Sequence, residues 1–405
     1  MKKRTIQFAI IAGLTLAISS HVHAQGIFDD GGADSNWTTG ANWDDGNVPS
    51  GINVNIGDGA ITGVTADFDA GTSTVGDLRV GVNGGSGALN IDAGTLTSTG
   101  WAFIGADNTA PTTAELNLSG TGSLVTPQRF YSGLNGGTTS SRVNVSDSAS
   151  LVSDVSVFGS NAGNTGVVNQ SGGVVSSNQW TTVGEGGGAD STYNLSGGQF
   201  TAGSDLTVGQ ADANTQGTFN VTGGTGTVGA NLFVGRGEFG GGGATGDLNL
   251  TGSAGTFSVL GNATFGSTAA TDAIGNLNFV ADSGGVTTLD VSGFLTLNDG
   301  SGVGSSNLTV DLTADSAFST FGTSGTLTEY LLVDNLNNAT TGNFAGLTEG
   351  ATVNIGGGQT GTISYFGGDG NDVVLNIFVT AVPEPSAVIF TSLGLIGLVV
   401  RRRRS

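Results

Sequence analysis

The sequence contains no cysteine, and its two histidines (His21 and His23), two lysines (Lys2 and Lys3) and single methionine all lie before Ala24. The chain from Gln25 to Ala381 therefore has none of these residues. Disulfide bonds are excluded as a source of stability. Catalytic systems that pair serine or cysteine with histidine, and the usual zinc and copper sites, are excluded from this region as well.

Positive charge is also scarce, with 11 lysine and arginine residues against 32 aspartate and glutamate residues. Seven of the basic residues lie near the two ends. The region from 25 to 381 keeps four, against 31 acidic residues, which gives it a formal charge of −27; the four are Arg79, Arg129, Arg142 and Arg236. This negative charge repels nucleic acid, because neutralisation of phosphates by basic residues supplies most of the affinity for that partner. It suits a hard cation such as Ca²⁺.

The segment from Met1 to Ala24 has the order of a secretory signal peptide. A basic start at residues 2–4 and an apolar stretch at residues 6–18 precede small residues that end at Ala24. We therefore expect signal peptidase to cut between Ala24 and Gln25, and the remaining chain to be exported.

The segment from Val382 to Ser405 reads V-P-E-P-S, then an apolar run from Ala387 to Val400, then four arginines and a serine. Proline lacks the N–H group that a helix or a strand ladder needs, so the Pro-Glu-Pro step isolates the segment behind it. The apolar run is shorter than the about 20 residues of a stable membrane helix. The four arginines hold its end on the cytoplasmic side. Residues 382–405 are therefore predicted to be a sorting signal, with a short hydrophobic helix that anchors the chain transiently in the inner membrane.

This layout resembles the PEP-CTERM tail of Gram-negative surface proteins. The resemblance implies recognition by an exosortase-type membrane protease, removal of the tail, and release to the cell surface or extracellular matrix. It covers only a small part of the chain, so it implies a destination and no activity. The residues that carry it are Pro383, Glu384, Pro385, Arg401, Arg402, Arg403 and Arg404.

Between the two ends the chain is repetitive. An apolar-Asn-apolar triplet recurs from Leu89 to Leu277, with successive offsets of roughly 25 to 29 along the chain. Each repeat holds about three short alternating stretches separated by Gly, Ser, Asn and Asp, which is typical of strands and sharp corners. A unit this small buries its apolar face only by stacking on its neighbours. We therefore predict an all-β protein, a right-handed parallel β-helix with one rung per repeat of roughly 25 to roughly 29 residues. It would have about 13 or 14 rungs.

The asparagine of each triplet has two interpretations. Its apolar neighbours point inward, so the asparagine faces outward, and stacked amides could bond from rung to rung as a ladder. Six of the eight asparagines also match N-x-Ser/Thr, the acceptor motif of N-glycosylation. The eight positions are Asn90, Asn117, Asn144, Asn169, Asn194, Asn220, Asn249 and Asn278.

Three regions are expected in the exported chain. Residues 89–307 form the repeat array, residues 25–88 an N-terminal capping segment with the first rungs, and residues 308–381 a C-terminal β segment. The capping segment carries Trp37 and Trp43, and its opening resembles that of bacterial autotransporter-associated repeat proteins. Two indoles can shield the edge of the first rung, or stack on a sugar. Trp101 and Trp180 lie inside rungs, where we expect them to pack.

The phrase G-G-D-G-N-D, from Gly367 to Asp372, resembles one half-turn of the calcium-binding nonapeptide rolls. Those rolls share each ion between consecutive copies, and this chain has a single copy. We expect a tight turn that leads into a terminal strand, with Ca²⁺ binding by Asp369 and Asp372 as the alternative.

The composition and the two end signals favour an exported, non-catalytic protein of the cell surface or extracellular matrix. Its partners would be signal peptidase and the exosortase-type protease during export, and extracellular polysaccharide afterwards. The main alternative is a glycan-binding or adhesion protein. Two further alternatives are a β-helical polysaccharide-degrading enzyme, which needs a pair of carboxylates or a basic residue with a shifted pKa, and an ice-binding protein with regular threonines.

Overall fold

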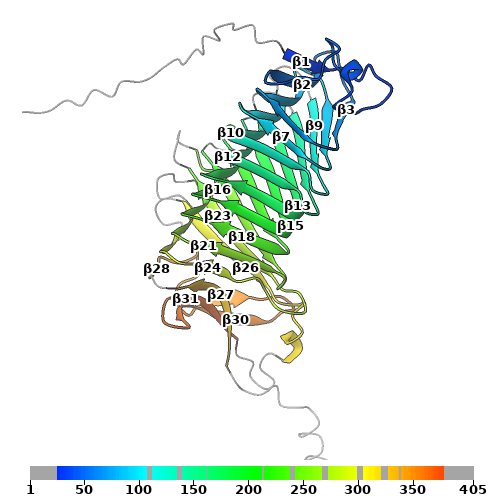
Figure 1. Ribbon diagram of the computed structural model, residues 1–405. Coiled ribbons are helices and arrows are strands. Elements are labelled where there is room, and N and C mark those ends of the chain that lie inside the picture. The colour runs from blue at the N-terminus through cyan, green and yellow to red at the C-terminus, as the bar shows by residue number, and fades with distance from the viewer. Residues whose placement is uncertain are drawn as a thin grey trace, which may run out of the picture.

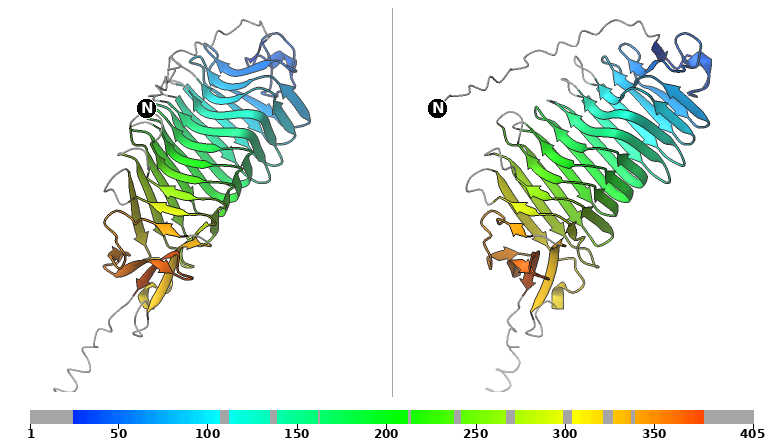
Figure 2. Two further views of the ribbon diagram at one scale, coloured as in Figure 1. Left: turned by 90° about the vertical axis from the view of Figure 1, so that its left-hand side faces the viewer. Right: turned by 60° about the vertical axis from the view of Figure 1, so that its left-hand side comes forward.

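The computed structural model describes residues 25–106, 112–134, 139–161, 163–211, 214–237, 242–266, 272–298, 304–320, 327–336 and 339–377. They form a β-solenoid of about 10 turns with roughly 27 residues each. Figures 1 and 2 show the strands stacked as ribs along a rod, with early and late turns at opposite ends. The predicted parallel β-helix is confirmed.

Each turn contributes strands to three parallel ladders, which we call the first, second and third sheets, because glycine-rich corners separate its three apolar stretches. The first sheet holds β3 (Val64–Phe68), β6 (Gly87–Ile91), β9 (Thr112–Leu118), β11 (Thr139–Val145), β13 (Thr165–Ser177), β15 (Asp190–Ala202), β17 (Gln216–Val221), β20 (Thr245–Thr251), β23 (Ile274–Val280) and β26 (Ser305–Asp311). The second sheet holds β4 (Thr72–Val75), β7 (Thr95–Ser98), β10 (Ser123–Leu134), β12 (Ser150–Ser160), β18 (Gly224–Val228), β21 (Gly255–Val259), β24 (Leu289–Val291) and β27 (Thr328–Asn335).

The third sheet carries the site described below. It holds β1 (Gln25–Phe28), β2 (Asn53–Asp58), β5 (Leu78–Val82), β8 (Ala102–Ala106), β14 (Thr181–Glu185), β16 (Leu206–Gln210), β19 (Leu232–Arg236), β22 (Ala263–Phe265), β25 (Leu295–Leu297) and β28 (Thr340–Thr341). Long strands bend around a corner: β13 and β15 pair in both the first and second sheets, and β10 and β12 in both the second and third.

The core is a set of apolar columns that run along the rod axis. In the first sheet, residues at one register face inward in every turn; they are Leu89, Leu116, Val143, Val168, Tyr193, Phe219, Leu248 and Leu277. All eight side chains are fully buried. The rings of Tyr193 and Phe219 stack with centroids 4.7 Å apart. Since each column is continuous, a turn gains its burial from the turns above and below it.

The glycine that closes most turns is needed for its backbone conformation. Gly184, after Val183, has φ +77°, and a Cβ atom there would overlap the carbonyl oxygen of Gln216 in the next turn. Any other residue would be strained by the positive φ, and its Cβ atom would also push the two turns apart.

The asparagine ladder is present over the whole first sheet. Asn90 donates through Nδ2 to Asp67 Oδ1 at 2.7 Å, and each later asparagine donates to Oδ1 of the one before, at 2.6 to 2.9 Å, as far as Asn278. The hydroxyl of Thr309 then donates to Asn278 and ends the ladder. The amides are thus engaged in a structural role, which is the first of the two interpretations.

The tryptophan pair closes the first turn. Trp37 and Trp43 are 1% and 2% exposed, and their rings meet edge to face with centroids 4.8 Å apart. The indole N–H of Trp43 donates to the carbonyl oxygen of Trp37 at 2.8 Å, and Phe28 packs edge-on against Trp43. Buried rings cannot stack on a sugar, so the shielding interpretation is the one that the structure supports.

The predicted number of 13 or 14 rungs is too high, since the solenoid has about 10 turns. That prediction assigned every residue to a rung. In the structure, the cap takes residues before β2, and the last turn is long, with Leu289 of β24 pairing with Val333 of β27. The predicted boundary at residue 307 also falls inside β26, and the parallel turn continues through β27 and β28.

After β28 the chain changes from parallel to antiparallel pairing. β29 (Thr352–Asn354), β30 (Thr360–Gly367) and β31 (Asp372–Ile377) form a meander in which β31 also pairs with β27. Two short 3-10 helices, Gly40–Asn42 and Phe318–Thr320, complete the described elements. Among the described residues no helix is long and apolar enough to cross a membrane.

Candidate functional site

The predicted export residues lie at or beyond the limits of the described chain. β1 begins at Gln25, the residue after the predicted cleavage site, whereas Ala24 lies outside the described residues. The whole sorting segment from 382 to 405, with Pro383–Pro385 and Arg401–Arg404, lies outside them as well.

The predicted turn between β30 and β31 is confirmed. Residues 368–371 join the two antiparallel strands, so Asp369 lies in the turn and Asp372 opens β31. Asp372 accepts a hydrogen bond from the backbone N–H of Asn335 at 2.9 Å through Oδ1. Within the described ranges, no three acidic or histidine side chains gather in a way that could hold a metal ion. Ca²⁺ binding by Asp369 and Asp372 stays a prediction.

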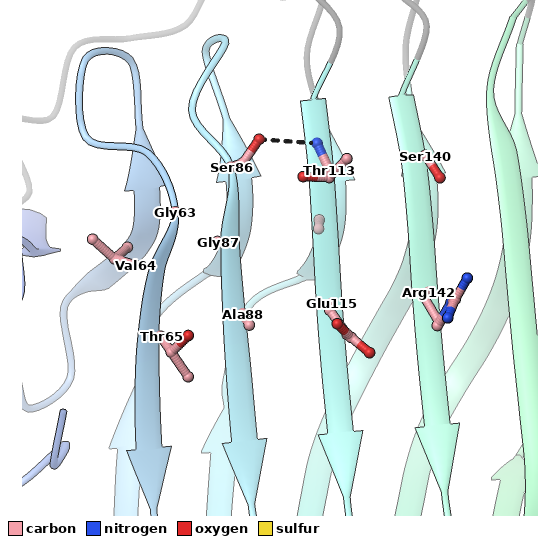
Figure 3. Close-up of a pocket in the computed structure, with 11 residues that line it drawn as sticks. Gly63, Val64, Thr65, Ser86, Gly87, Ala88, Thr113, Glu115, Ser140 and Arg142 are labelled. Carbon is pink, nitrogen blue, oxygen red and sulfur yellow. Dashed lines mark hydrogen bonds between the residues drawn. The ribbon is translucent and has the colours of Figure 1, made fainter.

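A shallow groove crosses the outer face of the first sheet near its N-terminal end (Figure 3). Its volume is about 330 Å³, and small residues such as Gly87 and Ala88 leave it open between Thr65 and Glu115. Glu115 and Arg142 occupy the same register on β9 and β11. Among the described residues that line the groove, Glu115 is the one carboxylate, and it accepts from Nδ2 of Asn144 at 2.9 Å. A single carboxylate tied to the ladder does not provide the pair that glycoside hydrolysis uses.

The outer face of the third sheet carries an unexpected group of side chains. Phe103 on β8 and Tyr131 on β10 share one register, and their rings stack with centroids 5.8 Å apart. Trp101 packs beside both rings, at 5.7 and 5.6 Å. Phe103 and Tyr131 belong to a buried cluster separate from the solenoid core, together with Val155 and Val157 of β12, and Trp180 packs against that cluster.

Arginines lie over these rings. Arg79 is 5.7 Å from the centroid of Phe103, and Arg129 lies between Trp101 at 5.7 Å and Trp180 at 5.4 Å. Arg129 also donates to the hydroxyl of Tyr131 at 2.8 Å. We call these six residues the aromatic–arginine cluster. Cation–π contacts of this kind are each worth about 0.5–1 kcal/mol at exposed sites, so the cluster orders long side chains on a surface.

Trp101 and Trp180 both pack, as predicted, but they do so against rings on the outer face of the sheet and not in the solenoid core. Trp180 is partly buried, but Trp101 keeps 37% of its surface exposed and lies outside the core. Three of the four arginines between 25 and 381, Arg79, Arg129 and Arg236, lie on this sheet, and Arg142 lies on the first.

A pocket of about 520 Å³ lies beside the aromatic–arginine cluster. This volume is within the ~300–1,000 Å³ typical of small-ligand sites. Polar side chains from several turns surround one aromatic ring there, that of Trp180; the lining residues are Arg129, Trp180, Thr182, Glu185, Asp205, Thr207, Gln210, Ala211 and Arg236. Ala211 has φ +81°, a conformation that favours glycine and that marks the rim as strained.

The charged groups of this pocket are held in place by their neighbours. Burial raises the pKa of the Glu185 carboxyl, and the nearby positive charge of Arg129 opposes that rise. Asp205 accepts from both the backbone N–H and Nδ2 of Asn231, each at 3.0 Å. Oε1 of Gln210 accepts from the Thr182 hydroxyl at 3.1 Å. The result is a set of fixed polar groups around Trp180, on a lining that is mostly apolar.

Sequence reasoning missed this pocket because its members are scattered from residue 129 to residue 236. One signal was available, since only four arginines occur between residues 25 and 381, and three of them stand on strands of one sheet.

Comparison with protein-family models, with curated proteins and with solved structures finds no match for this chain.

Proposed function

We propose that this chain is an exported, non-catalytic rod of the cell surface or extracellular matrix. Its signal peptide would end at Ala24, and an exosortase-type protease would remove the segment from 382 onward. One observation supports this most directly: a basic–apolar–small segment precedes Gln25 and a Pro-Glu-Pro, apolar and arginine segment follows Ala381, and every described strand lies between them. Both predicted signals lie outside these limits, so processing would leave every described strand intact.

The surface chemistry is consistent with such a role. An acidic rod with a net formal charge of −27 between 25 and 381 repels its own copies and stays dispersed in a hydrated matrix. The chain has no cysteine, so disulfides contribute nothing to its stability; columns of apolar side chains and the asparagine ladder run the length of the first sheet.

The sorting proposal is tested by substituting the triplet and following the protein through cell fractions. Replacing Pro383, Glu384 and Pro385 together by alanine is expected to hold the chain in the inner membrane, because the protease loses its recognition motif. Ser386→Ala, the adjacent position, is the matched control and should be released normally. Equal release of both variants would contradict sorting by the triplet.

A second candidate function, glycan binding, is favoured by the pocket beside Trp180. Trp180 and the polar side chains that converge on it are a combination found in sites for polar, hydroxyl-rich ligands. Ice binding is less well supported, because a flat face of exposed hydroxyls is needed and Thr182 and Thr207, which share a register, are buried.

A further inference from the structure

The pocket beside Trp180 extends along the rod. Its lining residues lie on β10, β14, β16 and β19 or directly beside β14 and β16, and β12 lies between β10 and β14. Strands of neighbouring turns lie about 4.8 Å apart, so five consecutive strands place these polar groups along about 19 Å. A ligand that uses all of them must be elongated and must offer polar groups at several points along that length.

We infer that this pocket binds a segment of an uncharged polysaccharide, a chain of neutral hexose units lying across the turns of the third sheet. A hexose has an apolar C–H face that packs on an aromatic side chain, and Trp180, whose ring also contacts Arg129, lines the pocket. Its hydroxyl groups both donate and accept hydrogen bonds. Carboxylates, guanidinium groups and amides with fixed positions are suitable partners for them.

The charges select an uncharged sugar over an acidic one. Arg129 and Arg236 line the pocket together with Glu185 and Asp205, so the formal charges within it balance. The rod around it carries a large excess of acidic residues. A polyuronate would approach against that field without meeting a net positive surface, whereas a neutral glycan has no such barrier.

The binding inference rests on the glycan-binding candidate stated above and is independent of the proposed export. Binding is a property of the purified protein, so a rod that reaches the surface but fails to bind would overturn this inference alone. Loss of export would leave the binding result unchanged.

The fluorescence of the four tryptophans gives a direct readout. Trp37 and Trp43 are buried in the cap, so a change on ligand addition reports Trp101 and Trp180. The probes are cellohexaose, laminarihexaose and mannohexaose, with hexagalacturonate as the charged hexamer. We expect at least one neutral hexamer to bind more tightly than hexagalacturonate at low ionic strength. Tighter binding of hexagalacturonate, or no binding of any neutral hexamer by fluorescence and calorimetry, would overturn the inference.

Three variants locate the site. Trp180→Ala should weaken binding by about tenfold and Glu185→Gln, which keeps the shape, by about fivefold. Phe294→Ala is the matched control, because Phe294 precedes β25 as Trp180 precedes β14 and is 53% exposed outside the pocket. It should bind like the unmodified protein.

Circular dichroism before titration shows whether each variant is folded. If Trp180→Ala fails to fold, Glu185→Gln decides the outcome. If the folded pocket variants bound the hexamer with unchanged affinity, the assignment of binding to this pocket would be overturned. New reducing ends released from a bound hexamer would overturn the assignment as a binding site without catalysis.

Discussion

Replacing Asn194 by alanine interrupts the asparagine ladder near its middle. Asn194 donates to Asn169 Oδ1 at 2.9 Å and accepts from Asn220 Nδ2 at 2.7 Å, so the substitution removes two hydrogen bonds. A net value of about 1 kcal/mol for each bond gives a loss of about 2 kcal/mol in the free energy of unfolding. Asn169 and Asn220 are half-buried, so water reaches the two orphaned groups and the loss should not exceed about 3 kcal/mol.

Urea unfolding followed by circular dichroism measures this loss, with Thr192→Ala as the control. Thr192 stands two residues earlier on β15 and is half-buried on the same outer face. Its truncation should change the free energy of unfolding by no more than about 0.5 kcal/mol. If Asn194→Ala and Thr192→Ala were equal within error, the ladder would contribute no stability and the reasoning would be refuted.

The same structure leads to four further predictions. Asn194→Asp should be destabilising at neutral pH, because an ionised carboxylate cannot donate to Asn169. The lost hydrogen bond raises the pKa of the introduced carboxyl in the folded protein, so the loss in the free energy of unfolding is full above that raised pKa and gone below about pH 4. Urea unfolding at a series of pH values measures this dependence. Trp43→Ala should cost about 3–5 kcal/mol and expose the cap to limited proteolysis, and an unchanged digestion pattern would contradict the capping role. Ala211→Gly should stabilise the protein by about 1 kcal/mol by relieving a positive φ, and a loss of stability would contradict the strain. Millimolar Ca²⁺ should leave the melting temperature unchanged, whereas a rise of several degrees would establish a calcium site that includes Asp369 or Asp372.

The strands, the inward columns and the ladder could be predicted because each depends on a pattern repeated along the sequence. An apolar residue on either side of asparagine fixes which side chains face inward, and stacking of equal units places Asn117 over Asn90. The tryptophan cap could be predicted for a related reason, since an end turn needs a cover and the pair precedes the first strong repeat.

The pocket beside Trp180 could not be predicted, because it depends on register between turns of unequal length. Arg129 follows an irregularity in the pairing of β10 with β12, which shifts its position relative to Val155. Only that local geometry brings its guanidinium over Trp180, two turns further along the third sheet. The predicted number of turns was wrong for a similar reason, since the length of a connection such as that between β24 and β27 has no periodic signal in the sequence.

The intact mass of the protein recovered from the extracellular fraction tests the central proposal most directly. The account predicts a chain that begins at Gln25 and lacks Arg401–Arg404. Recovery at the surface of a chain that still carries the arginine cluster, or retention of the complete chain from Met1 inside the cell, would contradict it.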